Sequence, residues 1–294
     1  MRFRSCLPKI ATALAFAVVP IIALACGDPA RDFVAGIEAA MVTVPAGSFV
    51  MGSEAGAPDA SPPHEVTLSR PFAVLRHEVT FDEYDAYCEL SGVPKPGDDG
   101  RGRGTMPVIN VSYAAAARFC NFLSEAAGLR PCYNSTGFEF DAEADGYRLQ
   151  TEAEWEYAAR GGPAGTAGTG PASGGQAYSG SAVADEVAWY GDLAAPRPVE
   201  GKAPNALGLY DMSGNVWEWC NDWYGDDYYA RSPAVDPLGA AYKDVSGGYG
   251  AKRVRRGGNY HESAEHAAVW ARSCDRPTQA DAGMGFRIAR TAGG

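Results

Sequence analysis

Two carboxylates flank a short glycine-containing turn in the segment GLYDMSGNVWEWCNDW. Gly and Asn tolerate positive φ, so residues 213–215 predict a turn, and residues 216–220 predict a strand after it. Side chains alternate along a strand, so Glu218 lies opposite the strand's two tryptophans and can point back toward Asp211. Carboxylate oxygens, together with the carbonyl oxygens of a turn, are the hard donors that Ca²⁺ prefers. Spacing alone favours a simpler alternative, in which Asp211 caps the turn and Glu218 pairs with an arginine such as Arg256.

A second group of residues with metal-binding chemistry lies further along the chain. His261, Glu262 and His266 fall within six residues, and imidazole with carboxylate suits Fe(II) or Zn²⁺. The alternative is that they are polar residues on a surface loop. Their spacing, on a segment with no predicted regular backbone, favours the loop.

Other sequence blocks extend along nearly the whole chain after residue 40. They are MVTVPAGSFVMGS (41–53), PFAVLRHEVTFDEYDAYC (71–88), YRLQTEAEWEYAARGG (147–162), RRGGNY (255–260) and GFRIAR (285–290). Together with the tryptophan-rich segment, and in this order, they resemble the formylglycine-generating enzyme family, also called the sulfatase-modifying-factor family. The resemblance implies an irregular, loop-rich α+β fold with a C-type-lectin-like core.

The resemblance also implies a structural calcium site. Its ligands fall on the Asp211 side chain, the Gly214 and Val216 carbonyls and the Glu218 side chain. A second calcium site would lie at residues 186–190. There the family supplies an Asn and this chain has Val187-Ala188-Trp189, which puts the second site in doubt.

The oxidase centre of the resembled family has no counterpart at the matching positions. Catalytic members oxidise a cysteine of a sulfatase to formylglycine with two copper-binding cysteines that follow the RGG-Ser block, because thiolates select Cu(I). Here residues 256–273 contain no cysteine, and Asn259 replaces the Ser. Copper is therefore not expected. Cys274, which follows this stretch, is on the wrong side to replace the pair.

Three functions compete. The first is an exported, calcium-braced module at the cell envelope that binds an unknown protein or small-molecule ligand and is not a formylglycine oxidase. The second is non-haem iron chemistry, as in sulfoxide synthases that carry a related domain; those enzymes take their iron-binding histidines from an additional domain, for which this chain has no room. The third is formylglycine generation through Cys220 and Cys274 in an unrecognised geometry.

The N-terminus predicts export to the bacterial periplasm or cell surface. Residues 1–25 combine Arg2, Arg4 and Lys9 with an apolar run and end in Ala-Leu-Ala, as a signal peptide does. Cys26 follows directly, so membrane attachment through a lipid on this residue is expected as an option beside ordinary cleavage. Residues 26–40 are expected to be a polar tether, and residues 41–292 the domain.

Composition excludes one class of partner. The 294 residues are 46% apolar and 21% charged, which is typical of a globular protein. Loss of the three basic signal residues, with no acidic one, changes the formal charge from −11 to −14. Nucleic acid is therefore not an expected partner. The basic run KRVRR at 252–256 is expected to neutralise nearby acidic groups.

Local signals predict the elements that position these residues. Helices are expected at 81–90, at 113–125 and from Thr151 onward; Thr80 with Glu83 and Thr151 with Glu154 have capping-box spacing. Strands are expected at 41–44, 48–52 and 64–68. Residues 94–105 and 161–184 are expected to be loops. Cys120 and Cys132 are close enough in sequence to form a disulfide in an oxidising compartment.

Overall fold

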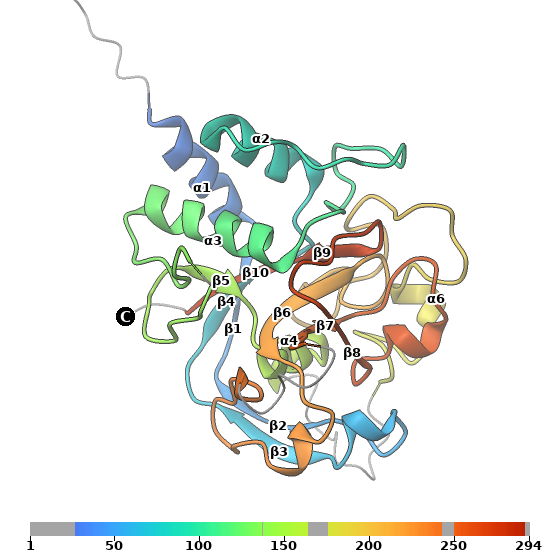
Figure 1. Cartoon of the computed structure of the whole chain (residues 1–294). Helices are drawn as coiled ribbons and strands as arrows, with labels where there is room; N and C mark the ends of the chain where they lie inside the picture. The colour runs from blue at the N-terminus through green and yellow to red at the C-terminus, as the bar shows by residue number, and fades with distance from the viewer. Residues whose placement is uncertain (1–26, 137, 164–175, 243–249, 292–294) are drawn as a thin grey trace, which may run out of the picture.

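The computed structural model describes residues 27–136, 138–163, 176–242 and 250–291 (Figure 1). The expected signal segment and Cys26 lie outside these residues. The described α-helices are α1 (Pro29–Ala39), α2 (Phe81–Ser91), α3 (Tyr113–Ala127), α4 (Glu152–Ala159) and α6 (Ala184–Val187). The described 3₁₀ turns are η1 (Pro58–Ala60), η2 (Tyr228–Ala230) and η3 (Ala264–Ala267).

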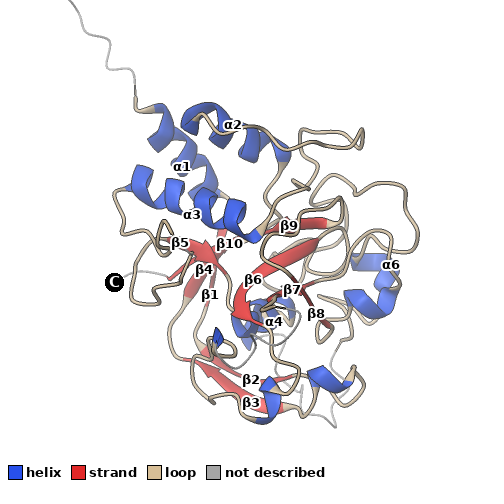
Figure 2. Cartoon of the chain, viewed as in Figure 1, coloured by secondary structure: helices blue, strands red, loops and turns tan. Residues whose placement is uncertain are grey.

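The strands form two four-stranded sheets and a separate hairpin (Figure 2). The first sheet has the order β1 (Met41–Val44), β4 (Phe72–Leu75), β10 (Ile288–Thr291), β5 (Tyr147–Leu149). The second has the order β8 (Arg272–Asp275), β7 (Arg253–Arg256), β6 (Trp217–Trp223), β9 (Met284–Phe286). The hairpin pairs β2 (Gly47–Met51) with β3 (His64–Leu68). This mixture of elements confirms the expected α+β class.

The predicted helix starts are confirmed in atomic detail. The Thr80 and Thr151 hydroxyls each accept a hydrogen bond from the N–H of the third helical residue. The carboxylates of those third residues, Glu83 and Glu154, accept a hydrogen bond from the N–H of the cap residue, so both capping boxes are complete. Gly128 ends α3 with a φ of 74°, a conformation that glycine adopts without strain. Strand β6 begins one residue later than expected and continues to Trp223.

The segment expected to be a tether contains a packed helix. Helix α1 begins after the Asp28 cap, and its Val34 and Ile37 side chains are 5% and 2% exposed. The ring of Phe33, on the same helix, packs against the ring of Phe119 in α3, with 6.3 Å between the ring centroids. From Pro29 onward, therefore, the chain packs on the domain, and α1 lies against α3 in Figure 1.

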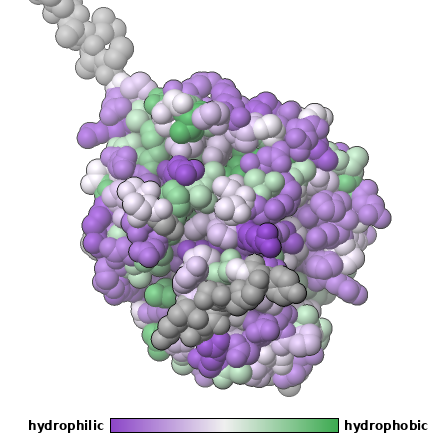
Figure 3. Space-filling model, viewed as in Figure 1, coloured by the Kyte–Doolittle hydropathy of each residue, from purple (hydrophilic) through white to green (hydrophobic). Residues whose placement is uncertain are grey.

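Two apolar clusters divide the core. One lies under α1, α2 and α3 and contains the aromatic rings of Tyr84, Tyr87 and Phe119, while the other lies between the β2–β3 hairpin and α4 around Trp155. The face drawn in Figure 3 is mostly hydrophilic, with apolar residues in small groups. No described helix is long and apolar enough to cross a membrane.

The five cysteines in the described residues are all free thiols. The expected bridge between Cys120 and Cys132 is therefore not formed in the structure. Both side chains are fully buried, and burial raises the pKa of each thiol above its usual value. Cys120 and Cys132 belong to the cluster under the helices, where they pack as small apolar residues.

Helix α4 is joined to the second sheet by buried ion pairs. Glu156 accepts hydrogen bonds from Arg256 at 2.5 Å and from Arg160 at 2.7 Å. Glu152 forms a bidentate ion pair with Arg272, with hydrogen bonds of 2.6 and 2.8 Å. Burial alone would raise the pKa of Glu156, but the two guanidinium groups hold it below its usual value. The basic run at 252–256 thus includes a residue that neutralises buried acid, as expected.

Glu156→Gln should lower the free energy of unfolding by about 3–5 kcal/mol, because it leaves buried positive charge without its partner. Urea unfolding measures this loss. Since the pKa of Glu156 is lowered in the folded state, its contribution is present above the ordinary pKa of Glu, about 4.3, and is lost as the pH falls further. Glu89→Gln, at an exposed pair with Lys95, is the control and should change stability by less than about 1 kcal/mol. Equal effects of the two changes would contradict this account.

Candidate functional site

The turn between Asp211 and Glu218 adopts the left-handed backbone that its sequence predicts. Asp211, Gly214 and Asn215 have φ values of 58°, 80° and 61°. A Cβ atom on Gly214 would lie 2.2 Å from the carbonyl oxygen of Trp189, so only glycine fits there. The Gly214 N–H donates to the Gly257 carbonyl at 2.7 Å, and the Asn215 N–H donates to the Trp189 carbonyl at 2.8 Å. The turn is therefore held between two other segments.

The two predicted calcium-binding carboxylates are buried beside a third acid, Glu78. Asp211, Glu218 and Glu78 are 3%, 1% and 0% exposed. Glu78 accepts hydrogen bonds from the Asn215 side chain at 2.6 Å and the Val216 N–H at 3.0 Å, and Asp211 accepts one from the Glu200 N–H at 2.7 Å. The structure thus assembles more acid around the turn than the sequence motif alone indicates.

One guanidinium group lies in this acidic cluster. Arg287 is fully buried and donates to Glu218 at 2.7 Å, to the Leu75 carbonyl at 3.0 Å and to the Tyr210 carbonyl at 2.7 Å. The simpler alternative for Glu218 is therefore correct about an arginine partner and wrong about which one. Arg256 lies opposite Glu218 in the pairing of β7 with β6, but its side chain donates a hydrogen bond to Glu156.

Carboxyl groups outnumber guanidinium groups around the turn. Burial, followed by the nearby Asp211 and Glu218, raises the pKa of Glu78 well above its usual range. Burial also raises the pKa of Asp211 to about 6. If all three acids ionise, Arg287 balances one charge, and the cluster keeps two negative charges away from water.

The segment where the family has its second calcium site carries cationic contacts in this protein. The Trp189 ring lies under the Lys202 ammonium at 4.3 Å, and the Arg197 guanidinium is 6.0 Å from the ring centre. Lys202 also donates to the Asp185 carbonyl. Two cationic side chains of the protein thus lie by the Trp189 ring at this position.

A pocket of about 570 Å³ opens where the RRGGNY block ends. We call it the Tyr260 pocket; residues on its wall include Arg101, Arg255, Tyr260, Glu262, Asp275 and Asp281. Its floor is joined to the turn, because the Tyr260 N–H donates to the Asn215 carbonyl at 2.8 Å. No motif in the sequence indicated Arg101, which lies in the glycine-rich loop at 94–105 and donates to the Tyr260 hydroxyl at 3.1 Å.

The hypothetical metal triad is not assembled. His261 lines the Tyr260 pocket, whereas His266 lies on η3, contacts Ser263 and faces the Trp217 ring at 6.3 Å. In the described part of the chain, no group of three or more His, Cys, Asp or Glu side chains has the arrangement of a metal-binding site. The loop interpretation of these residues is the one that the structure supports.

Cys220 and Cys274 lie on different strands of the second sheet. Cys220 is in β6 and Cys274 is in β8, and β7 runs between them with Val254 paired to Cys274. Two strand spacings separate their backbones by about 10 Å. Neither cysteine lines the Tyr260 pocket.

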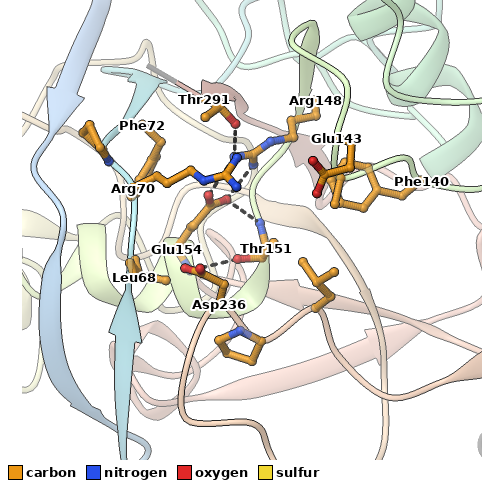
Figure 4. Close-up of a pocket in the computed structure, with 14 residues that line it drawn as sticks. Leu68, Arg70, Phe72, Phe140, Glu143, Arg148, Thr151, Glu154, Asp236 and Thr291 are labelled. Carbon is orange, nitrogen blue, oxygen red and sulfur yellow. Dashed lines mark hydrogen bonds and ion pairs between the residues drawn. The ribbon is translucent and has the colours of Figure 1, made fainter. Parts of the chain in front are cut away.

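A smaller pocket of about 190 Å³ lies on the first sheet (Figure 4). Its polar floor is the pair between Arg148 and Glu154, with hydrogen bonds of 2.6 and 2.7 Å, and Thr291 accepts a further bond from Arg148 at 3.4 Å. Leu68, Phe72 and Phe140 supply apolar walls. Because Arg148 and Glu154 satisfy each other, we interpret this floor as structural.

Comparison with known proteins shows which family the chain resembles along most of its length. The model of the sulfatase-modifying factor enzyme 1-like domain matches residues 29–292. A formylglycine-generating enzyme of Streptomyces coelicolor is 36% identical, over 85% of this chain and 89% of that protein. Among solved structures, the Treponema denticola variable protein 1 has a TM-score of 0.69 and 31% identity, and PvdO from Pseudomonas aeruginosa has 0.65 and 31%; each comparison covers 85% of this chain and 94% of the other. The fold, the ordered sequence blocks and these matches together show that the chain belongs to the formylglycine-generating enzyme family, also called the sulfatase-modifying-factor family.

Proposed function

We propose that this protein is an exported family member that binds a ligand or partner in the Tyr260 pocket and is not a formylglycine oxidase. The observation that carries the proposal is the chemistry of the pocket. Its wall holds acids, guanidinium groups and the rings of Tyr260 and His261, and among the described lining residues there is no thiol. This composition suits recognition by charge and hydrogen bonding better than copper chemistry.

The position of the remaining cysteines supports the same conclusion. A copper ion held by two thiolates needs both sulfurs on one ion, but β7 separates the strands of Cys220 and Cys274. Burial also raises the pKa of both thiols, which disfavours the thiolate form that binds metal. Copper therefore has no part in the proposal.

Calcium at the turn is the second part of the proposal. The Asp211 and Glu218 side chains and the Gly214 and Val216 carbonyls would hold the ion. The fit rests on the acidic groups: with Glu78, Asp211 and Glu218 all ionised, the cluster with Arg287 would carry an excess of two negative charges, and the raised pKa values of Glu78 and Asp211 reflect that crowding together with burial. Bound Ca²⁺ would offset that excess and tie the turn carbonyls. Its role would be to stabilise the fold.

The alternative function is a metal-dependent oxidase, either formylglycine generation or non-haem iron chemistry. The 36% identity to a protein named formylglycine-generating enzyme favours formylglycine generation. The composition of the Tyr260 pocket weighs against it. For iron chemistry, the separation of His261 from His266 removes the local ligand set.

The proposed location is the bacterial periplasm or cell surface. It rests on the signal-like residues 1–25, and attachment to the membrane would use a lipid on Cys26. Proposed partners are a protein or a small molecule, and not nucleic acid, given the negative net charge.

Removal of calcium should lower the melting temperature, because an ion that binds only the folded state stabilises it by about 2.7 kcal/mol at a hundredfold excess over Kd. Calorimetry with calcium and with chelator measures the difference. Asp211→Ala should abolish the difference without breaking the pair between Glu218 and Arg287, and Asp227→Ala, at an exposed residue, should keep it. A melting curve that chelator leaves unchanged would rule out the site.

The purified protein, with Cu(I), oxygen and a reductant, should not convert the cysteine of a Cys-x-Pro-x-Arg peptide to an aldehyde. Mass spectrometry and a hydrazide probe detect the product. Conversion well above a no-protein control, and lost in Cys274→Ser or Cys220→Ser, would show that an oxidase centre exists in another geometry.

In a bacterial host, the protein should fractionate with membranes, and Cys26→Ser should release it as a soluble exported form. Immunoblots of membrane and soluble extracytoplasmic fractions provide the measurement, with Cys274→Ser as the matched control that stays with membranes. A wild-type protein found wholly in the soluble exported fraction would favour ordinary signal cleavage.

A further inference from the structure

The cationic residues of the Tyr260 pocket already have acidic partners. The Arg101 guanidinium lies 3.5 Å from Asp99, and the Arg255 guanidinium lies 3.6 Å from Asp275. Arg255 also lies over the Trp217 ring at 4.9 Å and donates to Ser273 at 3.1 Å. Each guanidinium therefore has an acidic partner that offsets its charge.

Two acids of the same pocket have no cationic partner within the described residues. The Oε2 atom of Glu262 is shut off from solvent and has no hydrogen-bond partner there. Asp281 accepts hydrogen bonds only from neutral groups, the Gly283 N–H at 2.9 Å and the Gln279 amide at 3.4 Å. A carboxylate that loses water without gaining a donor is costly, so Glu262 in particular favours a positive group nearby.

The other walls of the pocket suit an organic cation. The Tyr260 ring is only 3% exposed and packs edge to face on the His261 ring at a centroid distance of 4.9 Å, so the exposed His261 ring is the aromatic surface of this wall. The segment that carries Tyr260 and Glu262 is fixed by bonds from the Leu193 N–H to the Tyr260 carbonyl at 3.1 Å and from the Gly191 N–H to the Glu262 carbonyl at 2.8 Å. This fixed backbone reduces the entropy lost on binding.

We propose that the Tyr260 pocket binds a primary ammonium group on an alkyl chain, with Glu262 and Asp281 as its acidic recognition residues. The inference rests on the proposed binding function and names its ligand chemistry. The ammonium group can come from a free alkyl diamine or from a lysine side chain of a protein. In both cases the ammonium charge lies in the pocket beside Asp281 and offsets the charge of the Glu262 carboxylate without touching its buried Oε2, and the alkyl chain lies beside His261.

The test is isothermal titration calorimetry of the purified protein with matched probes. Cadaverine represents the free diamine, and an acetylated, amidated Gly-Lys-Gly peptide represents the lysine side chain. Pentane-1,5-diol and glutarate are the neutral and anionic controls. At least one amine should bind measurably more tightly than both controls, and its affinity should fall as salt is added. The stronger of the two amines identifies the source.

Variants connect the binding to the two acids. Glu262→Gln and Asp281→Asn keep the shape of each side chain and should each weaken amine binding by about tenfold, in the range expected for one partly screened charge pair. Glu265→Gln, on the exposed η3 turn nearby, should bind the amine as the wild type does. Circular dichroism melting confirms that each variant is folded.

Three results would overturn the inference. They are amine affinity unchanged in folded Glu262→Gln and Asp281→Asn, tighter binding of glutarate or the diol than of either amine, and no binding of either amine. None of these touches the proposed function, whose failure has its own signature in aldehyde formation on the sulfatase-type peptide. A pocket that binds glutarate, for example, remains a binding pocket with a different ligand.

Discussion

The buried contact between Arg287 and Glu218 is the interaction on which the arrangement of the two sheets depends. Arg287 is the single residue between β9 and β10, which belong to different sheets. Its guanidinium joins Glu218 of β6 to the Leu75 carbonyl at the end of β4, and Trp155 of α4 donates to the same carboxylate at 2.8 Å. Loss of either charge would leave the other buried and unpaired, a cost of several kcal/mol.

The acidic turn and the Tyr260 pocket form one connected unit. The Asn215 carbonyl accepts from the Tyr260 N–H, and the Trp217 N–H donates to the Gly283 carbonyl at 2.8 Å, so the pocket is built directly on the turn and on β6. Anything that rigidifies the turn therefore also fixes the walls of the pocket. This link gives a bound calcium ion, as proposed, a route to influence ligand binding without touching the ligand.

Local features of the fold could be predicted from sequence, and long-range ones could not. The capping boxes at Thr80 and Thr151 depend on residues three positions apart, so the pattern contains the whole interaction. The partner of Glu218 depends on how distant strands meet, so the sequence indicated an arginine but not Arg287, although the GFRIAR block contains it. Glu78 and Arg101 were missed because nothing near them in sequence marks a site. The helix at 29–39 was missed because a short polar composition hid its two buried side chains.

The place of the last strands has a consequence for how the chain acquires its structure. Strand β10 lies inside the first sheet, between β4 and β5, and β9 is the parallel neighbour of β6 in the second. Both sheets therefore stay incomplete until residues 284–291 are available, and the pairing of β4 with β10 joins opposite ends of the domain. Such distant pairing is slow to form. A nascent chain of this protein is consequently unable to complete either sheet before residues 284–291 have been synthesised, and the edges of β4, β5 and β6 stay open to chaperones until then.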